Sequence, residues 1–169
     1  MSRNREKHCE KLLQEAGCSK NVLAHCRAVT ECACEYAAGN PDISFSLVER
    51  GAMLHDIGRG STHAIDHAQK GADLLRKKGF PEELARITEC HTGAGLTADE
   101  CTLLGLLPRD CIPSTTEEKI VTHADNLIAG HRRTTIDDTL ASAIHLPRKV
   151  RKRMYRLARE VELLCPRKG

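Results

Sequence analysis

The sequence contains no tryptophan and has only two tyrosines and two phenylalanines among its 169 residues. Few aromatic rings are therefore available to stack against unpaired bases, which is how many single-strand-binding domains hold nucleic acid. The 26 basic and 23 acidic side chains leave a formal charge of only +3. Because dedicated nucleic-acid-binding domains carry a larger positive excess, the composition argues against nucleic acid as the main partner.

Long apolar runs are also missing. The longest, such as residues 103–107, are far shorter than the roughly 20 residues that a membrane-spanning helix needs. The start of the chain, residues 1–9, is polar and charged, unlike the apolar centre of a signal peptide. We therefore expect a cytoplasmic chain with no membrane partner.

The nine cysteines never occur with the C-x-x-C spacing of a zinc ribbon or a thioredoxin-like site. Their odd number argues against a complete disulfide framework. Cys32 and Cys34 are the closest pair, but on a helix they would point about 200° apart, so a shared metal is not expected. We interpret the cysteines as reduced residues that mostly pack as small apolar side chains.

A chain of 169 residues is long enough for one domain with a sizeable core, and too short for two ordinary domains without a visible linker. We therefore treat residues 1–169 as a single domain. Alternating β-branched runs typical of strands are missing, whereas helix start and stop signals recur along the chain. The sequence predicts an all-α helical bundle.

The expected helices are bounded by capping residues and breakers. Ser19 can cap the second helix, which Gly39, Asn40 and Pro41 end. Thr97 and Glu100 have the spacing of a capping box, which predicts a short helix after Thr97. Residues 107–113 contain two prolines and are expected to form a loop. Besides this short helix, the expected helices cover residues 5–16, 21–38, 45–57, 66–79, 81–91, 116–129 and 147–165.

The last of these helices is amphipathic and basic. Its apolar positions recur at steps of three and four: Val150, Met154, Leu157, Val161 and Leu164. Its other face carries Arg148, Lys149, Arg151, Lys152, Arg153, Arg156 and Arg159. Such a face can be simply solvated, or it can attract phosphate-bearing substrates, and the sequence leaves both interpretations open.

Residues of the kinds that bind divalent metals lie on several different helices. Each alone has a simpler explanation, since most histidines and aspartates on helices are surface or capping residues. The doublet His55-Asp56 is harder to explain in this way, because it directly follows the apolar Ala52-Met53-Leu54. A charged pair in such a position needs a partner. The candidate ligands are His25, His55, Asp56, His67, His91 and Asp125.

Residues 53–59 read Met-Leu-His-Asp-Ile-Gly-Arg, which resembles the HDIG variant of the HD superfamily motif. In this superfamily, ligands in the order His, His-Asp, Asp hold a metal within an all-helical bundle. His25 resembles the first histidine of the motif, and Asp125 resembles its last aspartate. The resemblance implies a helical HD domain with the metal site between helices and a motif core at about residues 20–130.

Members of the superfamily with a second metal have two further histidines, one of them in a His-x-x-x-Gly-Ala pattern. His67, followed by Gly71 and Ala72, resembles that histidine, and His91 resembles the other. The resemblance therefore implies two divalent ions that share Asp56. Imidazole and carboxylate ligands favour iron or manganese and also suit zinc, nickel, cobalt or magnesium. The alternative is one metal, with His67 and His91 contacting substrate phosphate.

Further residues are candidates for contacts with a phosphorylated substrate. Arg59 stands where many HDIG proteins have lysine, and its guanidinium could stabilise negative charge on phosphoryl oxygens. His63, expected on a loop, could orient the substrate or protonate a leaving group. Phosphate contacts are also conceivable for Lys119, His131, Arg132 and Arg133, although a solvated role fits them equally well. His123 is expected to be a neighbour of the site rather than a ligand.

The sequence thus predicts a metal-dependent phosphohydrolase or phosphodiesterase that hydrolyses a small nucleotide-like or cyclic phosphate ester with metal-activated hydroxide. It is similar to small bacterial HD enzymes that split dinucleoside polyphosphates. It is also similar to small archaeal HD proteins, among them an iron-dependent phosphodiesterase that opens the 2′,3′-cyclic phosphate of dihydroneopterin. The alternative is a non-catalytic HD module that binds a nucleotide or a protein. Whether the chain forms a homo-oligomer is left open.

Overall fold

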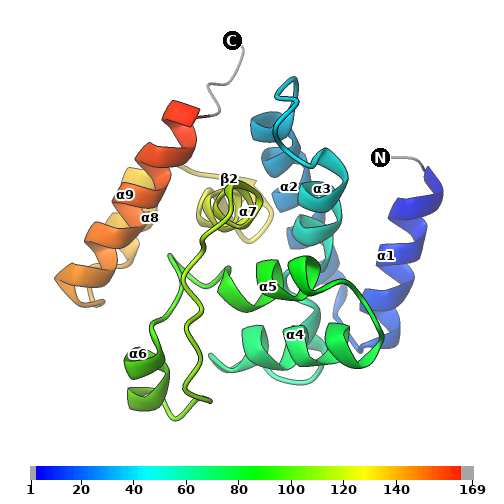
Figure 1. The fold of residues 1–169 in the computed structure, drawn as a ribbon, viewed down its shortest axis with the longest axis horizontal. Helices are drawn as coiled ribbons and strands as arrows, with labels where there is room; N and C mark the ends of the chain where they lie inside the picture. Colours follow the sequence, from blue (N-terminus) through cyan, green and yellow to red (C-terminus); the bar gives the residue numbers. More distant parts are fainter. Residues whose placement is uncertain (1–2, 165–169) are drawn as a thin grey trace.

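The computed structural model describes residues 3–164, with side chains from residue 6 onward, and this part of the chain is a bundle of α-helices (Figure 1). The prediction of an all-α fold is confirmed. The elements are α1 (Arg3–Glu15), α2 (Lys20–Ala37), α3 (Phe45–Leu54), the 3₁₀ helix η1 (Ile57–Gly60), α4 (His67–Lys77), α5 (Glu82–Cys90), α6 (Ala98–Leu103), α7 (Thr116–Asn126), β1 (Ile128–Ala129), β2 (Arg132–Arg133), α8 (Ile136–Ser142) and α9 (Arg148–Leu164).

Helix α7 lies near the centre of the molecule, where Figure 1 shows it almost end-on, and it packs against α2, α3, α5 and α9. Two apolar clusters fill the spaces between the helices. One includes Val29, Ile87 and Ile120, and the other includes Leu54 and Leu75. Helices α2, α3 and α5 contribute residues to both clusters. The helices that carry the candidate ligands are therefore fixed by apolar packing on two sides.

Two glycines let η1 and α4 approach each other closely. A Cβ atom on Gly58 would overlap the main-chain carbonyl of His67, and one on Gly71 would lie 2.9 Å from the Thr88 side chain and 3.0 Å from the Gly58 nitrogen. No larger residue fits either position without a shift of the backbone. The expected close approach at Gly71 is confirmed, and it brings the start of α4 against the His55-Asp56 segment.

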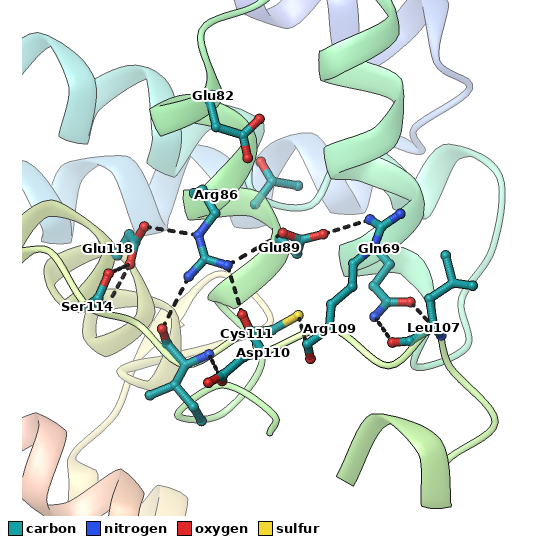
Figure 2. Close-up of polar contacts among 12 residues, drawn as sticks. Gln69, Glu82, Arg86, Glu89, Leu107, Arg109, Asp110, Cys111, Ser114 and Glu118 are labelled. Atoms are coloured by element: carbon teal, nitrogen blue, oxygen red, sulfur yellow. Dashed lines mark hydrogen bonds and ion pairs between the residues drawn. The ribbon is translucent and has the colours of Figure 1, made fainter. Parts of the chain in front are cut away.

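The long loop before α7 is bound to α4 and α5 by polar side chains (Figure 2). Arg86 donates hydrogen bonds to the carbonyl oxygens of Asp110 and Ile112, and Gln69 pairs with both the nitrogen and the oxygen of Leu107. Arg109 donates to the buried Glu89 at 2.8 Å. Burial alone would raise the pKa of Glu89, but Arg76 and Arg109 outweigh it and lower the pKa. The expected loop at residues 107–113 is confirmed. The hydrogen bonds from Arg86 and Gln69 hold it against α4 and α5.

The capping predictions are confirmed. Ser19 accepts a hydrogen bond from the Val22 nitrogen at 3.3 Å, and Thr97 and Glu100 form both bonds of a capping box.

Met154, Leu157 and Val161 of the last helix are buried as expected, whereas Leu164 is exposed. The eight described cysteines are free, and six of them are buried. Cys165, at the end of the predicted range 147–165, lies outside the described residues.

Two predicted helix ends were wrong. Helix α3 ends at Leu54 rather than residue 57, and η1 follows it. Helix α7 ends at Asn126 rather than residue 129, because the chain turns at Gly130, whose φ is +66°. Residues 128–133 then form a hairpin in which Ile128 pairs with Arg133. The sequence interpretation also missed α8, although Thr135 and Asp138 form a capping box at its start.

Among the described residues, no helix combines the length and apolarity that crossing a lipid bilayer requires.

Glu100 links α6 to α9 and should make stability depend on pH. It accepts hydrogen bonds from Arg153 at 2.7 Å and from the Thr97 nitrogen at 3.0 Å. Burial alone would raise the pKa of Glu100, but Arg153, Thr97 and Lys149 together lower it to about 2. A lowered folded-state pKa stabilises the protein above the unfolded value near 4.5, and this contribution disappears as the pH falls through the folded value.

We therefore predict that Glu100→Gln is less stable than the parent near neutral pH and that the difference shrinks as the pH falls from about 5 to 3. Urea unfolding followed by circular dichroism at several pH values measures this. Glu83→Gln, at an exposed position of α5, is the matched control. An unchanged difference between parent and Glu100→Gln across this pH range would contradict the assignment.

Candidate metal centre

All six candidate ligands converge on one site, although they come from five separate parts of the chain. His25 lies in the second turn of α2, and His55 and Asp56 follow the end of α3. His67 is the first residue of α4, and His91 directly follows α5. Asp125 lies in the last turn of α7. Four of these residues are buried, whereas His25 and Asp125 are partly exposed.

One half of the site consists of His25, His55 and Asp125. The Nε2 atom of His25 lies 2.9 Å from Oδ1 of Asp125 and 3.3 Å from Nε2 of His55. The Nε2 atom of His55 lies 3.6 Å from the same Asp125 oxygen. These three side chains can place one ligand atom each around a common point. We call this set the first half-site.

The other half consists of His67 and His91, whose Nε2 atoms lie 3.2 Å apart. Asp56 stands between the two halves. Its Oδ1 atom lies 3.3 Å from Nε2 of His67 and 3.4 Å from that of His91. Its Oδ2 atom lies 3.8 Å from Nε2 of His55 and 4.0 Å from that of His25. We call His67, His91 and Asp56 the second half-site; Asp56 has the orientation of a bridging carboxylate.

Backbone carbonyls determine which ring nitrogen of each histidine carries its proton. The Nδ1 atoms of the four histidines lie 2.7–2.8 Å from the carbonyl oxygens of Gly130, Ala52, Ala64 and Thr88. A carbonyl only accepts, so each Nδ1 is the donor, and in a neutral imidazole the Nε2 lone pair is left for a metal. All four Nε2 atoms point into the site.

This arrangement fits divalent metal ions. The Nε2 atoms form two facing pairs at 3.2 and 3.3 Å, and neutral imidazoles with protonated Nδ1 atoms have no proton to share there. Two nitrogens bound to one ion at about 2.1 Å would lie roughly 3.0–3.4 Å apart. The separations therefore match a shared cation, and the nitrogen and carboxylate donors are those that borderline divalent metals bind.

The site favours positive charge. Burial alone would raise the pKa of Asp56, but His55, His67 and His91 outweigh it and hold the pKa far below its usual range. Asp125 behaves in the same way, with His25 and His55 opposing burial. Burial alone would lower the pKa of His55, but Cys26 and Asp56 raise it well above the ordinary value. Positive charge is therefore stabilised between the two aspartates.

A cavity of about 320 Å³ opens onto these residues. Arg59 and His63 line it, as do Asn21, Val22 and Gly130. The Nε atom of Arg59 donates to Oδ1 of Asp56 at 3.2 Å, and its Nη1 atom donates to the carbonyl of His63 at 2.9 Å. The structure thus places both predicted catalytic side chains, Arg59 and His63, beside the candidate ligands.

The other predicted substrate contacts lie elsewhere. Lys119 pairs with Glu160 at 2.6 Å, and Arg133 pairs with Glu35 at 2.7 Å. Arg132 is exposed, and none of these three cations belongs to the described residues that line the cavity. Their contact with substrate stays a prediction. His123 lies 3.2 Å from the hydroxyl of Tyr36, away from the facing imidazoles.

Sequence reasoning missed Asn21, Val22 and Gly130. Asn21 and Val22 lie one turn before His25 on α2, so helical periodicity from the first histidine could have found them. Gly130 directly follows the helix expected at residues 116–129, a position that indicates only a helix stop. No sequence signal indicates that its carbonyl contacts His25, because 105 positions separate the two residues.

Comparisons with known proteins show the family of this chain. Residues 22–130 match the family called HD domain. An uncharacterized protein of Methanocaldococcus jannaschii is 51% identical over 127 residues, which are 73% of this chain and 75% of that protein. A tRNA (cytidine(56)-2′-O)-methyltransferase of Thermoplasma volcanium is 45% identical over 129 residues. That match covers 76% of this chain but only 38% of the methyltransferase.

Two solved structures share the fold. Both are the HD domain of the Listeria monocytogenes phosphodiesterase PgpH, one of them in complex with cyclic-di-AMP. Their TM-scores are 0.55 and 0.57, and they cover 92% and 95% of this chain. The match spans 96% and 98% of those chains, and the identity is 16% in both cases. At this identity, the likeness shows the fold alone.

We predict that the reconstituted parent binds two divalent ions per chain, and that His67→Ala and His25→Ala each bind one. Each substitution removes a ligand from only one half-site, so the other should remain. Metal analysis after anaerobic reconstitution with iron or manganese measures this, with the exposed His145→Ala as a control. One fully bound ion in both parent and His67→Ala would show that His67 is not a ligand.

Proposed function

The chain belongs to the HD domain family, and from this premise we propose that it is a metal-dependent phosphohydrolase acting on a small nucleotide-like or cyclic phosphate ester. The observation that carries the proposal is the position of Asp56. Its two oxygens face different pairs of imidazole nitrogens, and Arg59 contacts the same carboxylate beside the cavity. A two-ion phosphoesterase needs this combination of a shared carboxylate and an adjacent fixed cation.

The donor set supports two ions, with iron or manganese favoured by the imidazole and carboxylate ligands. When bound, such ions would lower the pKa of water and polarise the oxygens of a phosphate ester. The contribution of the chain itself is the orientation of the ligands. Each imidazole is held by a carbonyl, so the site is arranged before a substrate enters.

Arg59 is the candidate group for binding the reacting phosphate. Its Nε and Nη1 atoms already donate to Asp56 and to the carbonyl of His63. The two N–H groups of Nη2 remain for phosphate oxygens, which a forked guanidinium can bind in pairs. Because Asp56 and the His63 carbonyl fix the direction of its guanidinium, Arg59 can stabilise negative charge on the phosphoryl oxygens without first reorganising.

His63 is the candidate group for protonating a leaving oxygen. It lies in the loop between η1 and α4, it lines the cavity, and it is exposed. An exposed imidazole can exchange protons with solvent, as a general acid must between turnovers. The backbone of His63 is held by Arg59, so the phosphate-binding group and the candidate acid are fixed relative to each other.

The cavity size favours a small substrate. Its volume of about 320 Å³ lies near the lower end of the roughly 300–1,000 Å³ of small-molecule sites. The PgpH domain with the same fold was solved with cyclic-di-AMP, which supports a phosphodiester as the bond type. The resemblance to small archaeal HD proteins suggests a 2′,3′-cyclic phosphate, such as that of dihydroneopterin, as the specific candidate.

Turnover of a substrate panel tests the proposal. Protein reconstituted anaerobically with iron or manganese is incubated with 2′,3′-cyclic and 3′,5′-cyclic phosphates, linear diesters and dinucleoside polyphosphates. Metal-dependent hydrolysis of at least one class is expected. Binding of these compounds without turnover would instead identify a non-catalytic HD module, and neither binding nor turnover would overturn the proposed substrate class.

Asp56→Ala should abolish phosphoesterase activity, because it removes the carboxylate that faces both half-sites. The helices should stay intact, since the two apolar clusters hold them. Steady-state kinetics together with far-ultraviolet circular dichroism measures both effects. The control is Asp66→Ala, a change to a carboxylate that pairs with Lys70 on α4. Equal activity of Asp56→Ala and the parent would refute the mechanism.

Arg59→Ala should lower kcat on the order of 100-fold, as loss of a fixed electrostatic donor does in other enzymes. Its metal content should equal that of the parent, because a guanidinium is not a metal ligand. Arg59→Lys should recover only part of the rate, since lysine keeps the charge but loses the forked geometry. A large loss of bound metal in Arg59→Ala would show that the assigned role is wrong.

A further inference from the structure

His25 differs from the other three histidines in how its ring is held. His55 and His91 donate from Nδ1 to the carbonyls of Ala52 and Thr88, three residues earlier in the chain. His67 does the same with Ala64. His25 instead donates to the carbonyl of Gly130, 105 positions away, at 2.7 Å. Only one of the four rings thus depends on a distant segment.

The reason lies in the position of each histidine along its helix. His55 and His91 directly follow α3 and α5, and His67 begins α4. Carbonyls in the last turn of a helix lack intrahelical donors. The carbonyl of Ala64 lies before α4 and accepts from both the backbone nitrogen and the ring of His67. His25 lies inside α2 (Lys20–Ala37), where the carbonyls of the preceding turn are already bonded. Its orientation must therefore come from another element.

That element is the β1–β2 hairpin. Ile128 pairs with Arg133 and Ala129 pairs with Arg132, which leaves Gly130 and His131 as a two-residue turn. The φ of Gly130 is +66°, a value that glycine adopts without strain at the first position of such a turn. The Thr134 nitrogen donates to the Leu127 carbonyl at 2.8 Å and closes the base of the hairpin. The turn thereby presents the Gly130 carbonyl to His25.

A charged pair fixes this hairpin to the helix that carries His25. Nη1 of Arg133 donates to both carboxylate oxygens of Glu35, at 2.7 and 2.9 Å. Glu35 lies on α2, near the opposite end from His25. Both side chains are partly exposed, so the pair adds little to overall stability. Its effect is local, because a two-stranded hairpin alone is at best marginally stable.

We propose that the β1–β2 hairpin is a positioning element for the first half-site, with Arg133 and Glu35 as the positioning residues that keep the Gly130 carbonyl against His25. The inference rests on the proposed metal site. It assigns Arg133 a role other than the predicted contact with substrate phosphate. It also makes the two half-sites unequal, because the rings of His67 and His91 are held by the carbonyls of Ala64 and Thr88 rather than by the hairpin.

Titration of the metal-free full chain with Mn²⁺, followed by calorimetry, tests the proposal. Arg133→Ala and Glu35→Ala should weaken one of the two binding steps on the order of 10-fold, the lower end of what loss of an outer partner costs. The other step should keep the affinity of the parent. Arg132→Ala, the neighbouring arginine on the same strand, is the matched control and should leave both affinities unchanged.

Charge exchange separates positioning from general loss of structure. The double variant Glu35→Arg, Arg133→Glu should restore the weakened step, because the pair is rebuilt in reverse. Equal weakening of both steps, no weakening in either single variant, or no recovery in the exchange would overturn the proposal.

Histidine NMR spectra of the metal-free protein give a readout that needs no metal. The hydrogen-bonded Nδ1–H of His25 should be observed in the parent and in Arg132→Ala, and should shift or broaden in Arg133→Ala. The signals of His67 and His91 should not change. A parent that binds no metal would overturn the proposed function, whereas an unchanged His25 signal in Arg133→Ala would overturn the positioning role.

Discussion

Mutual repulsion among the ligand atoms is the constraint on which this structure depends. Four imidazole lone pairs and two carboxylates converge, with nitrogen atoms facing one another at 3.2 and 3.3 Å. Metal ligands are neutral imidazoles and ionised carboxylates. In that state no proton lies between the facing nitrogens, so these groups of like partial charge would separate if they were free to move. Rigid helices must therefore hold them until a cation neutralises the site. The two apolar clusters that flank α2, α3 and α5 supply this rigidity.

Several features far from the ligands make sense as consequences of this constraint. Gly58 and Gly71 remove the side chains that would keep α4 away from η1, and so allow His67 to reach Asp56. The network around Arg86, Glu89 and Arg109 fixes the long loop against α5 (Figure 2), the helix that ends at His91. Because buried ion pairs add little net stability, their value here is in fixing geometry.

The sequence predicted those parts of the fold and site that have local signals. Helix caps such as Ser19 and Thr97 depend on residues three positions apart, and the ordered set of candidate ligands carries its own spacing pattern. The hairpin gave no such signal, since its strands are two residues long and Gly130 also suits a helix stop. The pairing of Arg133 with Glu35 joins positions 98 apart. Contacts of that kind depend on the packing of α2 beside the hairpin, which no local pattern contains.

The way the helices end explains why two of the four imidazoles, those of His55 and His91, need no outside support. Where α3 and α5 stop, the carbonyls of Ala52 and Thr88 lose their intrahelical donors and accept from His55 and His91 instead. The carbonyl that becomes free where the helix ends therefore also orients the ligand. The hydrogen bond also satisfies a backbone group that would otherwise be buried without a partner. His25 lies inside a helix, where the carbonyls of the preceding turn are already bonded. A separate element, the β1–β2 hairpin, must therefore supply the carbonyl that accepts from its ring.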